Sequence, residues 1–155
     1  MASLLIADDD PDIRFLLRRK VEAAAGPLSV VGEAASGDEA VEMWRRLRPD
    51  AIVLNQRMPG LTGLEAAALI LGEHPAQVIV LFSGFWDDDM ERASAELGLR
   101  ACLAKADLPR LIDVLLEHLN LAPTAEINVS DPDTVEAPKE VDVTETPERS
   151  GLDPQ

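Results

Sequence analysis

The stretch SLLIADDDP, residues 3–11, decides the fold of this chain, because a short apolar run stops at three acidic residues and a proline. An apolar run without polar alternation predicts a strand that is buried on both faces of a sheet. Asp10 followed by Pro11 predicts a helix start, since aspartate caps helix N-termini and proline suits the first turn. The stretch therefore predicts a buried strand that ends in carboxylates and leads directly into a helix.

The same alternation of apolar runs and amphipathic stretches continues to residue 121. The expected strands cover residues 3–7, 28–34, 51–54, 78–82 and 101–104. The expected helices begin after Asp10, at capping boxes in residues 36–39 and 62–65, and at the acidic run 87–89. A last helix is expected to pack Leu108, Leu111, Ile112, Leu115, Leu116 and Leu119. Five strand–helix units of this kind predict an α/β fold, a doubly wound (βα)5 parallel sheet with strand order 2-1-3-4-5.

Composition changes near Ala122, and residues 122–155 differ from everything before them. They hold nine acidic residues, two basic residues and five prolines, hence a net charge of −7. They carry no apolar period long enough to bury one face of a helix or strand. We therefore expect residues 1–121 to form one domain and residues 122–155 to be a disordered acidic tail, either an interaction segment or a solubilising extension.

The charge of the whole chain argues against several classes of function. A net charge of −15 disfavours direct binding to nucleic acid and to an anionic membrane surface. The single cysteine, Cys102, rules out an internal disulfide and a cysteine-based metal cage. The chain starts without a secretory signal pattern and contains no apolar run of about 20 residues, so we expect a cytoplasmic protein.

Polar side chains follow four of the expected strands: Asp8 and Asp9 the first, Asn55 the third, Ser83 the fourth and Lys105 the fifth. In a doubly wound sheet the carboxyl ends of the strands border one crevice, so these side chains should converge there. Neighbouring carboxylates repel one another, and a hard cation such as Mg²⁺ relieves that repulsion. A hydroxyl and an ammonium group add a donor and a charge for phosphoryl oxygens. The pattern predicts a site for a Mg²⁺-bound phosphoryl group, although each residue alone has an ordinary structural explanation.

Several motifs in this arrangement resemble the CheY-like receiver domain of response regulators in two-component signalling. They are residues 4–11, 49–54, 57–60 and 82–84, together with Lys105. The resemblance covers residues 1–121 and implies the CheY-like fold, which is also that of flavodoxin. It is carried by the motifs jointly, because each of them alone is short.

The resemblance also implies a role for each residue of the predicted crevice. Asp8 and Asp9 match the acidic pair that binds Mg²⁺, and the backbone carbonyl of Arg57 matches a further metal ligand. Ser83 and Lys105 match the residues that contact the phosphoryl group.

Asn55 departs from the family, because it stands where receivers carry the aspartate that accepts phosphate and helps to bind the metal. A carboxylate attacks phosphorus and forms an acyl phosphate, whereas a carboxamide is uncharged and a poor nucleophile. We therefore expect no phosphorylation by the usual chemistry and a weakened Mg²⁺ site. Two explanations stay open: a natural pseudo-receiver, or an ordinary receiver whose aspartate has been replaced to block phosphorylation.

Cys102 is a second departure. Receivers often carry tyrosine or phenylalanine at this switch position, three residues before the lysine, and the ring moves inward when the neighbouring hydroxyl moves. A cysteine has no ring to report that motion. We expect Cys102 to be a small buried core residue.

These features together favour a single-domain signalling module without enzymatic activity. It would bind a histidine kinase, another receiver or an output protein, and a homodimer is compatible with it. One rival is a haloacid-dehalogenase-like phosphatase, whose Asp-x-Asp motif residues 8–10 imitate. A flavodoxin-like cofactor binder is a weaker rival, since no phosphate-cradling loop follows the first strand.

Overall fold

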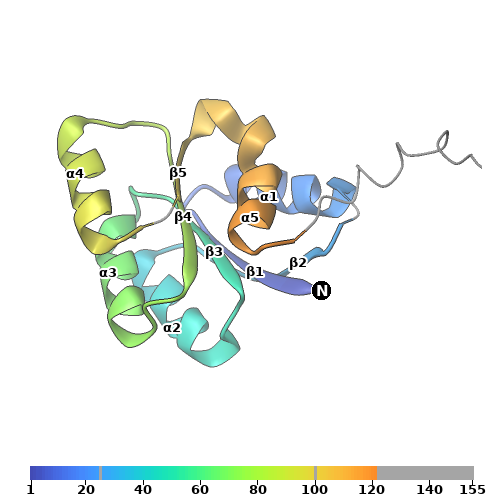
Figure 1. Ribbon diagram of the computed structural model, residues 1–155, viewed down its shortest axis with the longest axis horizontal. Helices are drawn as coiled ribbons and strands as arrows, with labels where there is room; N and C mark the ends of the chain where they lie inside the picture. The colour runs from blue at the N-terminus through green and yellow to red at the C-terminus, as the bar shows by residue number, and fades with distance from the viewer. Residues whose placement is uncertain (25, 100, 122–155) are drawn as a thin grey trace, which may run out of the picture. The chain divides into compact units, whose positions relative to one another are not determined.

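The computed structural model describes residues 1–24, 26–99 and 101–121. Its strands are β1 (Ala2–Ala7), β2 (Leu28–Ala34), β3 (Ala51–Leu54), β4 (Val78–Ser83) and β5 (Ala101–Ala104). Its helices are α1 (Pro11–Ala24), α2 (Gly37–Leu47), α3 (Gly63–Glu73), α4 (Asp88–Leu97) and α5 (Leu111–His118), with a 3₁₀ helix, η1 (Lys105–Arg110), before the last (Figure 1). The predicted acidic tail lies outside the described residues.

The five strands form one parallel sheet in the order β2-β1-β3-β4-β5, which confirms the predicted doubly wound α/β fold. The register of β1 and β3 aligns the carboxyl ends of these two strands. Ala7 at the end of β1 pairs with Leu54 at the end of β3. The backbone N–H of Asn55 continues the ladder by donating to the Ala7 carbonyl at 2.9 Å. The residues that follow β1 and β3 therefore start side by side.

Helices cover both faces of the sheet, which explains why its central strands are apolar throughout. Helices α1 and α5 cover one face, and α2, α3 and α4 lie on the other (Figure 1). Strand β1 shows the division, because Leu4 and Ile6 contact the first core and Leu5 and Ala7 the second. On the second face the indole of Trp44 is fully buried and donates to Gln77, so this large side chain fills the core without an unpaired N–H.

Local capping starts most of these helices as expected. The box at residues 62–65 is complete, since Thr62 and Glu65 each accept from the other's backbone amide. The box at residues 36–39 forms only in part: Ser36 accepts from the Glu39 amide, but the Glu39 carboxylate accepts from Ala35. Both arrangements satisfy amides that a helix N-terminus leaves without an intrahelical partner.

The apolar residues assigned to the last helix belong to two elements, a 3₁₀ turn and an α-helix. Residues 105–110 form the 3₁₀ turn η1, and α5 begins only at Leu111. Pro109 has no N–H to give to an α-helical hydrogen bond, and Asp107 leaves helical geometry, with φ −97° and ψ 24°. Leu108, which the sequence assigns to the last helix, therefore lies in η1, although it packs against the same core as α5.

Candidate functional site

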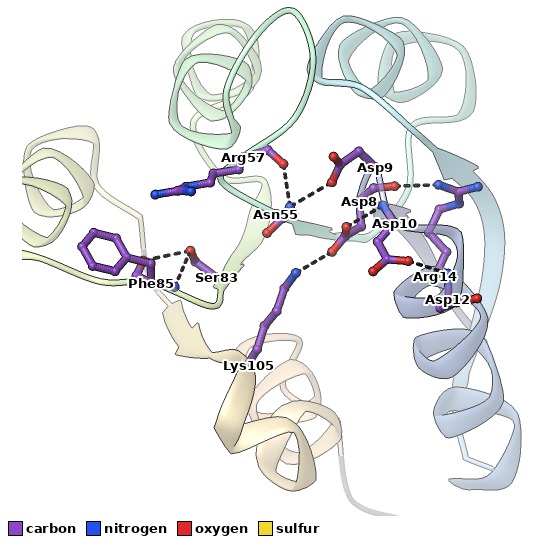
Figure 2. Close-up of polar contacts among 10 residues, drawn as sticks. All are labelled: Asp8, Asp9, Asp10, Asp12, Arg14, Asn55, Arg57, Ser83, Phe85 and Lys105. Atoms are coloured by element: carbon purple, nitrogen blue, oxygen red, sulfur yellow. Dashed lines mark hydrogen bonds and ion pairs between the residues drawn. The ribbon is translucent and has the colours of Figure 1, made fainter.

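The polar residues at the carboxyl ends of the strands border a common crevice of about 380 Å³. Its lining consists of Asp9, Asn55, Arg57, Ser83, Gly84, Phe85 and Lys105. Asp8 lies beside this lining and is connected to it through the side chain of Lys105 (Figure 2). The structure thus brings together the residues that the sequence placed at the ends of four different strands.

Asp8 is the buried anion of the site, with 1% of its surface exposed. One carboxylate oxygen, Oδ2, lies 3.0 Å from Lys105 Nζ, and the other, Oδ1, accepts from the Asp10 amide at 2.9 Å. Burial raises the pKa of this carboxyl above its ordinary value, although the Asp10 amide and the Lys105 ammonium both act to lower it. Both oxygens therefore already have a partner within the chain.

Asn55 is also buried, and its side-chain amide nitrogen faces two oxygens. It donates to the Arg57 carbonyl at 2.7 Å and lies 3.5 Å from Asp9 Oδ1, at the outer limit of a hydrogen bond. In the reverse orientation the amide oxygen would face two other oxygens, neither of which can donate. The two partners therefore decide that the nitrogen, and not the oxygen, faces them. The Arg57 carbonyl faces Asn55 while its guanidinium points away (Figure 2).

Ser83 turns toward its own loop. Its hydroxyl donates to the Phe85 carbonyl at 2.9 Å and accepts from the Phe85 amide at 3.3 Å (Figure 2). The Phe85 ring is about half exposed, and the Arg57 guanidinium carbon lies 5.7 Å from its centre. The structure therefore places Ser83 in the crevice wall, with its hydroxyl engaged by the backbone of that wall.

Two residues of the site carried no signal in the sequence. Arg14 of α1 donates to the Asp8 carbonyl at 2.7 Å and pairs with Glu33 of β2, so it holds the backbone of the acidic turn. Phe85 forms one wall of the crevice with the Arg57 side chain. Neither could be found from spacing, because Glu33 and Arg57 are distant in sequence and only the fold brings them close.

The model of the response regulator receiver domain matches residues 4–116 of this chain. The chain belongs to this family. The chemotaxis protein CheY of Listeria monocytogenes is 31% identical over 122 residues, which cover 79% of this chain and 98% of CheY. The response regulator domain of Thermotoga maritima CheB has the same fold, with a TM-score of 0.70 and 25% identity over 79% of this chain and 99% of that domain.

Several other relatives of this receiver are longer proteins. A protein-glutamate methylesterase/protein-glutamine glutaminase of Myxococcus xanthus is 40% identical over 124 residues. That match covers 72% of this chain and 35% of the relative. The similarity thus spans about a third of that longer protein, and it concerns the receiver part of this chain.

Cys102 of this receiver is exposed, so the prediction of a buried core residue is wrong. Strand β5 lies at the edge of the sheet, and its burial alternates, so the residue between Ala101 and Leu103 faces outward. Cys102 borders a second hollow of about 340 Å³, which Trp86 and three carboxylates of α4 and its cap also line. Desolvation raises the pKa of the Cys102 thiol, Glu91 adds to the rise, and the neighbouring Ser94 hydroxyl opposes it.

Receiver domains typically bind Mg²⁺. The oxygens available for a metal here are those of Asp8, Asp9, the Arg57 carbonyl and the Asn55 side chain. Within residues 1–24, 26–99 and 101–121, no group of three or more His, Cys, Asp or Glu side chains could hold a metal ion. No helix in the same residues is long and apolar enough to cross a membrane.

Proposed function

We propose that this receiver transmits a two-component signal by binding a protein partner, without accepting phosphate at Asn55. The partner is a histidine kinase, another receiver or an output protein. The observation that carries the proposal is the state of the Asn55 side chain. It is buried and neutral, and its amide nitrogen is committed to the Arg57 carbonyl. Such a group cannot form the acyl phosphate that a carboxylate forms.

The rest of the crevice supports a loss of phosphate chemistry in particular. Lys105 is paired with Asp8, and the Ser83 hydroxyl is bonded to Phe85. Neither side chain is directed by a hydrogen bond toward Asn55. The acidic pair, the Ser83 hydroxyl and the Lys105 ammonium are all retained, whereas Asn55 supplies no nucleophile.

Helix α1 offers a surface for protein binding. Phe15 and Leu16 are 61% and 46% exposed, and Arg19 lies over the Phe15 ring at 5.8 Å. Neighbouring large apolar side chains in water are typical of interaction sites. This surface is separate from the crevice, so a partner can bind there regardless of phosphate.

We also propose that the chain is not an enzyme. A phosphatase of the haloacid-dehalogenase type would need Asp8 as an accessible nucleophile. Asp8 is almost fully buried, and both its oxygens have partners in the chain. The carboxylates of Asp9 and Asp10 are exposed, but that chemistry needs the first carboxylate after the strand, Asp8, to be free.

The test compares the chain that carries Asn55, called the natural chain below whichever origin Asn55 has, with Asn55→Asp, which restores the family's carboxylate. Each protein is incubated with acetyl phosphate and Mg²⁺, and acid-labile phosphate is measured by intact mass. We expect no adduct on the natural chain and one on Asn55→Asp. Asn120→Asp, at an exposed position, adds the same charge elsewhere and serves as the control. A stoichiometric acid-labile adduct on the natural chain would overturn the proposal.

A pull-down with the same three proteins separates the two origins of Asn55. If the natural chain is a pseudo-receiver, it captures the same partner with and without acetyl phosphate. If only phosphorylated Asn55→Asp captures a partner, the chain is an ordinary receiver whose acceptor has been replaced.

A further inference from the structure

Four of the oxygens that a divalent cation would need in this crevice already have donors. Asp8 Oδ2 accepts from Lys105, and Asp8 Oδ1 accepts from the Asp10 amide. Asp9 Oδ1 and the Arg57 carbonyl share the amide nitrogen of Asn55. Mg²⁺ binds oxygen at about 2.0–2.1 Å and demands near-octahedral geometry. To enter, it would have to break bonds that the chain makes to itself.

The orientation of Asn55 makes the donor set unsuitable for the metal. Its N–H₂ group, which carries partial positive charge, points at the oxygens that would surround a cation. An amide nitrogen has no lone pair to give, because it is conjugated with the carbonyl. Turning the amide over would present its oxygen, but the Arg57 carbonyl would then lose the donor at 2.7 Å.

The charges around the crevice also argue against a bound divalent cation. The charged side chains of the crevice lining are Asp9, Lys105 and Arg57, with Asp8 beside them, and the Arg57 guanidinium points away from Asn55 (Figure 2). Lys105 balances Asp8 at 3.0 Å, which leaves Asp9 as the carboxylate of the lining and Asn55 neutral beside it. An aspartate at position 55 would add one negative charge beside Asp9, and the repulsion would have to be relieved by a cation.

We infer that the Asn55 amide takes the place of the divalent cation, so that the loop after β3 is held to the acidic turn after β1 without metal. The Asn55 nitrogen joins the Asp9 carboxylate to the Arg57 carbonyl, the two oxygens that the cation would join. The residues present do not fit Mg²⁺, and the crevice stays closed to it. The inference rests on the proposed function and adds that partner binding is independent of divalent cations.

The experiment uses Mn²⁺ as a paramagnetic probe on the full natural chain. Mn²⁺ broadens the amide resonances of residues close to it, so each binding position is read separately in a ¹⁵N spectrum. We expect no selective broadening at residues 8, 9, 55 and 57, whatever the probe does at exposed carboxylates. Selective broadening at these four residues, relieved by added Mg²⁺, would overturn the inference without any variant.

A matched pair of variants measures the size of the effect. Asn55→Asp should bind Mg²⁺ in calorimetry at least about tenfold more tightly than the natural chain, because it supplies the missing charge. Its thermal midpoint should rise on adding Mg²⁺, whereas those of the natural chain and of Asn120→Asp should move equally little. Equal Mg²⁺ affinity in all three proteins contradicts the inference.

Phosphate labelling separates this inference from the proposed function. A natural chain that ignores Mg²⁺ but still gains an acid-labile phosphate would refute the proposed function alone. A natural chain that binds Mg²⁺ at residues 8, 9, 55 and 57 but gains no phosphate would refute only the cation replacement.

Discussion

Lys105 and Asp8 form an ion pair of 3.0 Å between residues that are 97 positions apart in the chain. The pair connects the end of β5 with the end of β1, across the two strands that lie between them. Asp8 is buried, and 27% of the Lys105 side chain is exposed. The pair is therefore shielded from water on its acidic side, where the loss of the partner matters most.

Lys105→Met should destabilise the protein by about 1–3 kcal/mol, because it leaves a buried carboxylate oxygen without a donor. Urea denaturation of both proteins measures the difference. Arg92→Met is the matched control, since Arg92 pairs with Asp89 where both side chains are largely exposed. Exposed pairs contribute about 0–1 kcal/mol, so the control should change little. Equal effects of the two substitutions would show that the Lys105 pair is no stronger than a surface pair.

The raised pKa of Asp8 predicts a pH dependence of stability. The folded protein holds the Asp8 proton more tightly than the unfolded chain does, so protonation favours folding. This contribution is fully present below the ordinary carboxyl pKa of 3.8 and is lost as pH rises through the raised value. The free energy of unfolding of the natural chain, relative to Asp8→Asn, should therefore fall as pH rises through this window.

Urea titrations at a series of pH values, with EDTA present, measure this difference. Other carboxyl groups cancel because both proteins contain them. Asp113→Asn removes one carboxylate at an exposed position and serves as the control. A difference that grows with pH would mean that the pairing with Lys105 outweighs burial at Asp8.

Gly63 and Gly72, at opposite ends of α3, should respond oppositely to alanine. A Cβ on Gly63 would collide with the carbonyl oxygen of Asn55 and with Leu81, so Gly63→Ala should cost about 1–3 kcal/mol. A Cβ on Gly72 meets no neighbour among the described atoms, so Gly72→Ala should stabilise by about 0.5–1 kcal/mol. Thermal or urea unfolding measures both. Destabilisation by both substitutions would show that α3 as a whole rejects alanine.

Cys102 should react slowly with iodoacetamide at neutral pH. It is the one cysteine of the chain, so the rate of alkylation reports on it directly. The midpoint of the pH–rate curve should lie above 9.0, the ordinary thiol value, because desolvation and Glu91 disfavour the thiolate. Glu91→Gln should lower the midpoint, whereas Glu96→Gln, exposed on the same helix, should leave it in place. A midpoint at or below the ordinary value contradicts the raised pKa.

The sequence by itself determined the strands, their parallel arrangement and the edge of the sheet where the site lies. These features depend on information that is local in the chain: the length of apolar runs, the period of the helices and the capping residues beside them. A helix boundary depends on more than the apolar pattern, because Pro109 cannot donate a backbone hydrogen bond and α5 begins only at Leu111. The strand order followed because short right-handed connections leave few alternatives.

Only the tertiary structure decided what each side chain does at that edge. Cys102 is exposed because β5 lies at the sheet edge, a property of strand packing that its apolar neighbours do not reveal. Arg14 reaches Asp8 because α1 turns back along β1, and Lys105 reaches Asp8 across the crevice. The sequence showed an amide at position 55, but the donor it presents to Arg57 and Asp9 exists only because folding brings the turns after β1 and β3 together.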